Sequence, residues 1–377
     1  MRIAYEDNEL RHKRRRYRFE RSAGLPVRPE NRMLTDGQNY AIERDVSMLA
    51  AFKRSPADVV LREVPMPEPG RGEILIKVMS CGICGGDIGS SDEYVRFGHE
   101  IAGEVIALGA EVHRLSPGMR VAIESGAFCG VCDVCRNGRP DLCRNVTDGS
   151  YCGCAEYAVV KEKNAVVLPD ALSYRHAALI EPLGVAIDLV KTAEIGMGDH
   201  VLVLGAGSIG LMALELARRA GASRIWAACR SRATRKIELA RAFGAEDVIL
   251  TDSQSISDYP FPRGGVDKVL ITAPPAVIPQ ALGVMRYGGI AAFIGFGGDG
   301  AITIDAHRFH TGKLQLRGAF SSPGIYFPLA MEALTTGMVD ADALISHAMP
   351  LKDIAALMHA AGCERESAVK CVMLAEQ

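Results

Sequence analysis

The sequence predicts an α/β protein made of an all-β, barrel-like part and a doubly wound parallel sheet. The chain has 377 residues, which is more than one ordinary hydrophobic core accommodates. Short β-like runs broken by Gly and Pro occupy residues 48 to about 180, and strands alternate with helices after about 184. With 48% hydrophobic and 23% charged residues, the composition excludes a wholly disordered chain.

In the first part, the β-like runs lie at 59–64, 73–79, 101–107, 120–124 and 155–160. In the second part, strands are predicted at 200–204, 223–229, 247–250, 267–272 and 290–295, with helices at 209–220 and 233–243. This alternation is typical of βαβ units and so predicts parallel strands. The last 55 or so residues return to mixed short elements. The most apolar stretch, 201–217, contains three glycines and Glu215, so we expect no membrane span.

The first 47 residues differ from the rest in charge. Residues 1–32 carry ten basic and five acidic side chains, a net charge of +5, so −7 remains for the rest of a chain whose formal charge is −2. The basic run 11–16 suits nucleic acid or anionic membranes. We favour a solvated, mobile arm, or a start codon placed too early, because Met48 begins an ordinary domain start. We therefore expect no nucleic-acid or membrane partner.

The eleven cysteines are too sparse for a disulfide scaffold, and an odd number cannot pair completely. The N-terminal residues are charged and lack the apolar region of a secretory signal. We therefore expect a cytoplasmic protein with reduced thiols, some of them metal ligands. For Cys152 and Cys154 we favour packing in the interior over a redox or substrate-lining role.

A glycine-rich turn follows the predicted strand 200–204 and opens a helix. It consists of Gly205, Ala206, Gly207, Ser208, Ile209 and Gly210. In a G-x-G-x-x-G turn of this context, the first glycine permits the tight turn, the second admits a pyrophosphate, and the third allows close helix packing. The helix N-terminus then offers N–H groups to the phosphates. The pattern predicts a dinucleotide-binding site.

The choice between the two nicotinamide dinucleotides depends on the end of the next strand. An NAD site places an acid there for the ribose 2′-hydroxyl, but this chain has Cys229. The next residues are Arg230, Ser231, Arg232, Ala233, Thr234, Arg235 and Lys236. Guanidinium groups suit a 2′-phosphate. We expect NADP(H) to be favoured over NAD(H), with Arg230, Ser231 and Arg235 as binding residues.

Two cysteine-containing groups predict zinc. Cys129, Cys132, Cys135 and Cys143 form a C-x2-C-x2-C-x7-C loop, and four nearby thiolates complete a closed tetrahedral site. A second, dispersed group consists of Cys84, Asp87, His99, Glu100 and Glu181. Three protein ligands with one exchangeable position are typical of catalytic zinc, and Asp87 is suited to orient the His99 ring.

Residues 48–377 resemble the zinc-dependent medium-chain dehydrogenases of the alcohol dehydrogenase superfamily. The resemblance rests on the segments 82–87, 98–100, 155–157 and 181–183, the four-cysteine loop and the glycine turn 205–210. Glu181, where alcohol dehydrogenases have a third ligand thiolate, makes the chain similar to the sorbitol, threonine and polyol dehydrogenases.

The resemblance implies a GroES-like catalytic domain, residues 48–183 and 321–377, split around a Rossmann domain, residues 184–320. It implies a cleft active site and a homodimer or homotetramer. Zinc would activate the oxygen of a small alcohol or ketone substrate, with Cys84, His99 and either Glu100 or Glu181 as ligands. We expect hydride transfer between NADP(H) and a secondary alcohol or ketone of a polyol, sugar or cyclitol.

The proton relay departs from this family pattern. Relatives usually carry Ser or Thr two residues after the ligand cysteine and often His three residues later, whereas this chain has Gly86 and Gly89. Ser90, Ser91, Tyr94, Glu100 or a water chain could replace them. One alternative is reduction of a conjugated alkene or iminium, which would not need the relay. Another is a regulatory relative that keeps the cofactor without the chemistry.

Overall fold

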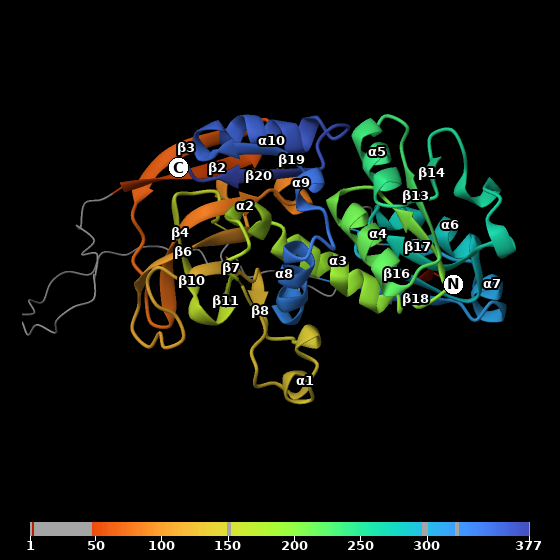
Figure 1. Ribbon diagram of the computed structural model, residues 1–377, viewed down its shortest axis with the longest axis horizontal. Helices are drawn as coiled ribbons and strands as arrows, with labels where there is room; N and C mark the ends of the chain where they lie inside the picture. The colour runs from red at the N-terminus through yellow and green to blue at the C-terminus, as the bar shows by residue number, and fades with distance from the viewer. Residues whose placement is uncertain (1, 4–46, 149–151, 296–300, 321–323, 377) are drawn as a thin grey trace, which may run out of the picture.

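The computed structural model describes residues 2–3, 47–148, 152–295, 301–320 and 324–376. It shows a β-rich part at one end of the molecule and a layered α/β part at the other (Figure 1). The predicted α/β class, with a barrel-like β part and a doubly wound parallel sheet, is confirmed.

The β-rich part contains two main sheets. One has the order β3 (Asp58–Pro65), β2 (Ser47–Ser55), β5 (Val95–Arg96). The other has the order β11 (Ala165–Val167), β7 (Arg120–Ile123), β6 (Glu100–Leu108), β4 (Glu73–Gly82), β20 (Lys370–Leu374), β19 (Ile345–Pro350), and β10 (Tyr157–Lys161) pairs with β4. Strands from the last part of the chain thus complete the sheet begun by the first part. Its interior includes Cys154, whose Sγ lies 3.9 Å from that of Cys81.

The α/β part is a six-stranded parallel sheet. Its order is β14 (Asp247–Leu250), β13 (Arg224–Cys229), β12 (His200–Leu204), β15 (Val266–Ile271), β16 (Met285–Phe293), β18 (Gln315–Gly318). This is the strand order of a dinucleotide-binding fold. The five strands expected from the sequence are present. The sixth, β18, was not predicted because four residues with two polar side chains give no clear alternation.

Helices and short strands connect and cover these sheets. The helices are α1 (Asp133–Arg136), α2 (Tyr174–Ala177), α3 (Ile180–Thr192), α4 (Ser208–Ala220), α5 (Thr234–Ala242), α6 (Ile278–Gly283), α7 (Ala306–Thr311), α8 (Phe327–Thr335), α9 (Ala341–Leu344) and α10 (Ile354–Cys363). The short strands are β1 (Arg2–Ile3), β8 (Gly126–Ala127), β9 (Thr147–Asp148) and β17 (Ile302–Thr303).

Helix α3 joins the two parts. It packs against α4 of the α/β part and also contacts β6 and β7 of the β-rich part. Its buried residues, including Leu183 and Leu189, belong to a hydrophobic core to which both parts contribute side chains. The junction proposed at 183/184 lies inside this continuous helix, so the chain passes from one part to the other without a loop there.

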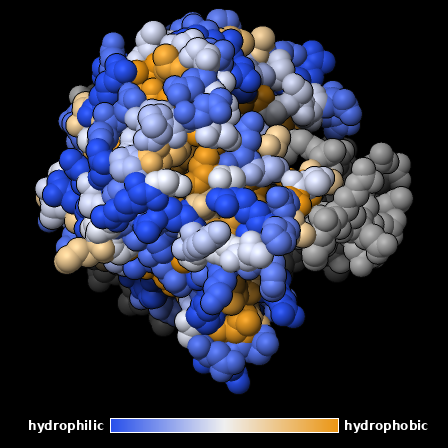
Figure 2. Space-filling model, turned by 90° about the vertical axis from the view of Figure 1, so that its right-hand side faces the viewer, coloured by the Kyte–Doolittle hydropathy of each residue, from blue (hydrophilic) through white to orange (hydrophobic). Residues whose placement is uncertain are grey.

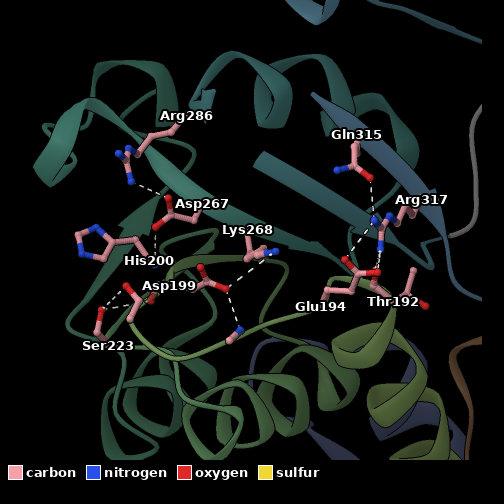
Figure 3. Close-up of polar contacts among 12 residues, drawn as sticks. Thr192, Glu194, Asp199, His200, Ser223, Asp267, Lys268, Arg286, Gln315 and Arg317 are labelled. Carbon is pink, nitrogen blue, oxygen red and sulfur yellow. Dashed lines mark hydrogen bonds and ion pairs between the residues drawn. The ribbon is translucent and has the colours of Figure 1, made fainter. Parts of the chain in front are cut away.

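Carboxylates at the start of the parallel sheet hold its central strands in place (Figure 3). Asp267 accepts the backbone N–H of His200 at 2.9 Å and the Arg286 guanidinium at 2.6 Å. Asp199 accepts the N–H of Gly196 at 2.8 Å and lies 3.9 Å from the Lys268 ammonium. These contacts connect β12 to β15 at the end of the sheet opposite the glycine turn.

The first residues contact the α/β part, because Arg2 and Ile3 pair antiparallel with Thr303 and Ile302. The expected mobile arm and its basic run 11–16 otherwise lie outside the described residues. Hydrophilic side chains cover much of the face in Figure 2, and apolar ones form separate patches. None of the described helices has the length and apolar character that crossing a bilayer requires.

Candidate active site and metal centres

Cys84 is held at the start of a short 3-10 helix, Gly85–Ile88, directly after β4. Its Sγ accepts the N–H of Gly86 at 3.4 Å, and its own N–H donates to Asp87 Oδ2 at 2.9 Å. Gly82 leaves room for the Glu100 side chain of the neighbouring strand, since a Cβ there would lie 1.9 Å from a Glu100 carboxylate oxygen. The local backbone therefore fixes the thiol beside the start of β6.

Cys84, His99 and Glu100 offer ligand atoms that all lie within 4.8 Å of one another. Thiolate, imidazole and carboxylate are the groups that zinc binds in proteins. Burial lowers the pKa of His99, but the hydrogen bond and charge of Cys84 and the charges of Glu181 and Asp87 outweigh it and raise that pKa to about 10. The surrounding anionic groups thus favour a cation here, and the donor set fits zinc.

Asp87 and Glu181 border this cluster. The buried Asp87 carboxylate lies 3.8 Å from His99 Nδ1. Glu181, in the first turn of α3, accepts a hydrogen bond from Ser125 Oγ at 2.7 Å. Burial and the charge of Glu100 raise the pKa of Glu181 to about 7. The geometry therefore separates the two glutamates: Glu100 lies within the three-residue cluster, and Glu181 lies at its edge.

Lys370 lies beside the cluster although nothing in the sequence singled it out. Its Nζ donates to Glu100 Oε1 at 2.5 Å and to the carbonyl of Ile83 at 3.0 Å. Burial lowers its pKa, but the charges of Glu100 and Cys84 raise it above the ordinary lysine value. Lys370 and Ser125 are the neighbours that sequence reasoning missed, because only the folding of distant segments brings them to the site.

The four cysteines of the second group converge in the lobe around α1, which projects from the β-rich part (Figure 1). The Sγ atom of Cys132 lies 3.4 Å from that of Cys135 and 3.9 Å from that of Cys143. Backbone N–H groups of Val131 and Cys132 lower the pKa of Cys129 to about 6. Four thiols in this arrangement fit a closed zinc site. All eleven cysteines are described, and all are free thiols.

The glycine turn after β12 has the geometry of a phosphate cradle. Gly205 has φ +105°, and a Cβ on Gly210 would lie 1.9 Å from the Gly205 carbonyl oxygen. A Cβ on Gly207 would meet no atom within 4 Å, so its outer face is open. Helix α4 begins at Ser208, and no side chain of the N-cap residue accepts a hydrogen bond from the N–H groups of its first turn. The arrangement fits a pyrophosphate at the helix N-terminus.

The loop after β13 presents the candidate 2′-phosphate residues. Arg230, Ser231 and Arg235 are all exposed. Arg235 lies 3.5 Å from the Glu238 carboxylate, within α5. Ser231 contacts Asp252, an acid that sequence reasoning did not single out. Asp252 lies two residues beyond the short strand β14 and belongs to no motif, so the sequence did not indicate its role.

The positions of the absent relay groups lie close to Cys84. The Gly89 carbonyl accepts a hydrogen bond of 2.7 Å from the buried Lys53 ammonium. The hydroxyl of Tyr94, one of the possible replacements, donates to Asp58 at 2.7 Å. Of the suggested replacements, Glu100 is the one within the cluster.

Comparison with known proteins identifies the family. Residues 70–170 match the alcohol dehydrogenase GroES-like domain, and residues 208–336 match the zinc-binding dehydrogenase domain. A sorbitol dehydrogenase from Bacillus subtilis (strain 168) is 31% identical over 80% of this chain and 89% of its own length. The chain belongs to the zinc-dependent medium-chain dehydrogenases. It is therefore an oxidoreductase of the alcohol dehydrogenase type, with a GroES-like part and a Rossmann part.

Two further relatives support this placement of the dehydrogenase. An L-threonine 3-dehydrogenase from Saccharopolyspora erythraea is 32% identical over 80% of this chain and 92% of its own length. A crystal structure of a zinc-binding dehydrogenase from Sinorhizobium meliloti 1021 bound to NADP is 30% identical, with a TM-score of 0.77, and covers 88% of this chain and 100% of that one. Zinc and a nicotinamide dinucleotide are therefore the cofactors of the family to which this chain belongs.

Proposed function

We propose that this dehydrogenase transfers hydride between NADP(H) and a secondary alcohol or ketone of polyol, sugar or cyclitol type. The observation that carries the proposal is the cluster of Cys84, His99 and Glu100 beside Glu181. Helix α3 begins next to this cluster and packs against α4, the helix that the glycine turn opens. The sorbitol and threonine of the named relatives each carry a secondary hydroxyl beside another polar group, which supports this substrate class.

Cys84, His99 and Glu100 would hold the catalytic zinc, and the four-cysteine lobe would hold a structural one. When bound, catalytic zinc supplies a Lewis acid that polarises an alcohol oxygen. Asp87 orients the His99 ring, and Lys370 compensates part of the Glu100 charge. Glu181, positioned by Ser125, has a pKa of about 7 and can therefore exchange a proton with the surroundings near neutral pH.

Gly205, Gly207 and Gly210 would hold the pyrophosphate, and Arg230, Ser231 and Arg235 would hold the 2′-phosphate. The absence of an acid at Cys229 and the NADP-bound relative both support NADP(H). Replacing the exposed Arg230 by Ala removes a charge-assisted contact, so we expect NADPH affinity to fall by about tenfold or more. An unchanged Kd for NADPH would argue against this role.

The test of the whole proposal is a screen of cofactor consumption with polyols, ketoses and enals, using NADP(H) and NAD(H) in parallel. We expect turnover with a secondary alcohol or ketone, and its loss after zinc is removed with a chelator and its return with Zn²⁺. Full turnover by the zinc-free protein, or no substrate among polyols and ketoses, would contradict the proposal.

Reduction of a conjugated alkene or iminium is the second candidate, because Gly86 and Gly89 provide neither hydroxyl nor imidazole. Deuteride from labelled NADPH distinguishes the two reactions. Label on the former carbonyl carbon supports the first, and label on a β-carbon or iminium carbon supports the second. We do not favour a purely regulatory role, since the metal-binding side chains are assembled.

We also propose a cytoplasmic homodimer or homotetramer. The eleven free thiols are suited to a reducing compartment. Light scattering coupled to gel filtration gives the mass in solution, and a mass of one 40.4 kDa chain would contradict the oligomer.

A further inference from the structure

The exposed loop after β13 is hydrogen-bonded to an acidic residue in the turn that follows the neighbouring strand, β14. Asp252 accepts the N–H of Ser231 at 2.9 Å on Oδ1 and at 3.2 Å on Oδ2, and it accepts the Ser231 hydroxyl at 2.7 Å. Both donors of Ser231 are therefore engaged by one carboxylate. The hydrogen bonds from Ser231 and, to a smaller extent, the charge of Arg230 lower the pKa of Asp252, so it is ionised at neutral pH.

Strand pairing explains why these two residues meet. Cys229 at the end of β13 pairs in register with Leu250 at the end of β14. Ser231 and Asp252 each follow two residues later, at the carboxyl ends of adjacent parallel strands. In open α/β sheets, ligands bind beyond these ends. From the turn after β14, Asp252 therefore places a carboxylate near the end of β13, where this chain has Cys229 in place of the acid typical of NAD sites.

The Asp252 carboxylate borders open space rather than the protein interior. Asp252 is exposed and helps to line a pocket of about 320 Å³. The other lining residues are Thr251, Ser253, Gln254, Ser255, Ile256 and Gln280. Asp252 thus both lines this pocket and holds the exposed Ser231.

We propose that Asp252 is a residue that discriminates between the two cofactors. It disfavours the 2′-phosphate of NADP(H) and favours the free 2′-hydroxyl of NAD(H). It thereby limits the preference for NADP(H) that Arg230 creates. The inference rests on the cofactor site of the proposed function. A 2′-phosphate that used the Ser231 donors would have to displace the carboxylate and lie beside a like charge. A 2′-hydroxyl can instead donate to the carboxylate.

Replacing Asp252 by Asn tests this, because the amide oxygen can still accept from Ser231 while the charge is lost. The full-length, zinc-loaded enzyme is titrated calorimetrically with adenosine 2′,5′-bisphosphate and with 5′-AMP, so the readout is binding rather than turnover. We expect the affinity ratio of the first nucleotide to the second to rise about tenfold in D252N, the size expected for removal of one like charge at an exposed site.

Two further variants control the result. D252A should change the ratio in the same direction, and D258N, which removes an exposed carboxylate that is not bonded to Ser231, should leave it unchanged. An unchanged or lower ratio in D252N would overturn the proposal. If the wild type binds neither nucleotide, the cofactor site itself fails and the Asp252 role with it. If the wild type prefers 5′-AMP, the NADP(H) preference fails, while the shift in D252N still decides the role of Asp252.

Discussion

Lys370 and Glu100 form a buried ion pair beside the candidate catalytic zinc ligands, with side chains that are each 2% exposed and Nζ 2.5 Å from Oε1. Three adjacent strands create this contact: Val372 on β20 pairs with Gly82 on β4, and Gly82 pairs with Glu100 on β6. The C-terminal strand therefore supplies a charge to a site whose other residues come from the first half of the chain.

Replacing Lys370 by Met should destabilise the zinc-free protein, prepared with a chelator, by about 3–5 kcal/mol, because the buried Glu100 carboxylate would then have neither Lys370 nor zinc to compensate its charge. Unfolding in urea measures the loss. The exposed pair Arg71–Glu111 provides a matched control, and R71M should cost less than about 1 kcal/mol. Equal effects of the two substitutions would contradict the importance of the buried pair.

The two metal centres should be separable by mutation. Replacing Cys135 by Ser removes one of four converging thiols, and replacing Cys84 by Ser removes one of three ligands in the other group. We expect two zinc ions per chain in the wild type and one in each variant, because a site that loses a thiolate binds zinc far more weakly. Elemental analysis by mass spectrometry gives these numbers, and C363S, at an exposed cysteine, is the control. A full complement of two zinc ions in C135S would exclude the lobe as a zinc site.

The site residues that belong to local sequence motifs were predicted, whereas the site residues that folding brings in from distant segments were not. The four cysteines and the glycine turn are local patterns, and Cys84, His99 and Glu100 flank the adjacent strands β4 and β6. The bond from Lys370 to Glu100 spans 270 residues, and the bond from Ser125 to Glu181 spans 56. Neither residue belongs to a motif, so only the folded chain identifies them: strand register brings Lys370 to Glu100, and the packing of α3 brings Glu181 to Ser125.

Two glycines of the same turn should respond differently to substitution by Ala. Gly207 faces open space, so G207A should leave the unfolding free energy within about 0.5 kcal/mol of the wild type. A methyl group there would nevertheless separate the backbone from a pyrophosphate, at a cost on the order of 1–3 kcal/mol, or about 10- to 100-fold in NADPH affinity.

G210A should behave in the opposite way. Its Cβ would lie 1.9 Å from the backbone oxygen of Gly205, so α4 would have to move and the fold should lose about 3 kcal/mol or more. Urea unfolding and titration with NADPH separate the two effects. Unchanged NADPH affinity in G207A would argue against binding of the pyrophosphate at this turn.

Glu215 should make stability depend on pH at a site away from both metal centres. Its Oε1 accepts the N–H of Asp340 at 3.2 Å, whereas its buried Oε2 has no hydrogen-bond partner among the described residues. Burial raises its pKa from 4.5 to about 7. Because the folded chain holds this proton more tightly than the unfolded chain, Glu215 should reduce stability as pH rises from 4.5 to 7, with no further loss above that range.

Replacing Glu215 by Gln removes the titration and keeps an acceptor for Asp340. We therefore expect the unfolding free energy of E215Q, measured relative to wild type, to be about 1 kcal/mol larger at pH 8 than at pH 5. Partial solvent exposure of the Glu215 carboxyl group keeps this difference below the full value that the pKa shift implies. Urea unfolding of both proteins at the two pH values measures the difference, in which the titration of all other groups cancels. E238Q, at an exposed position on α5, should show no such gain. If the stability difference between E215Q and wild type is the same at both pH values, Glu215 does not titrate between them in the folded protein.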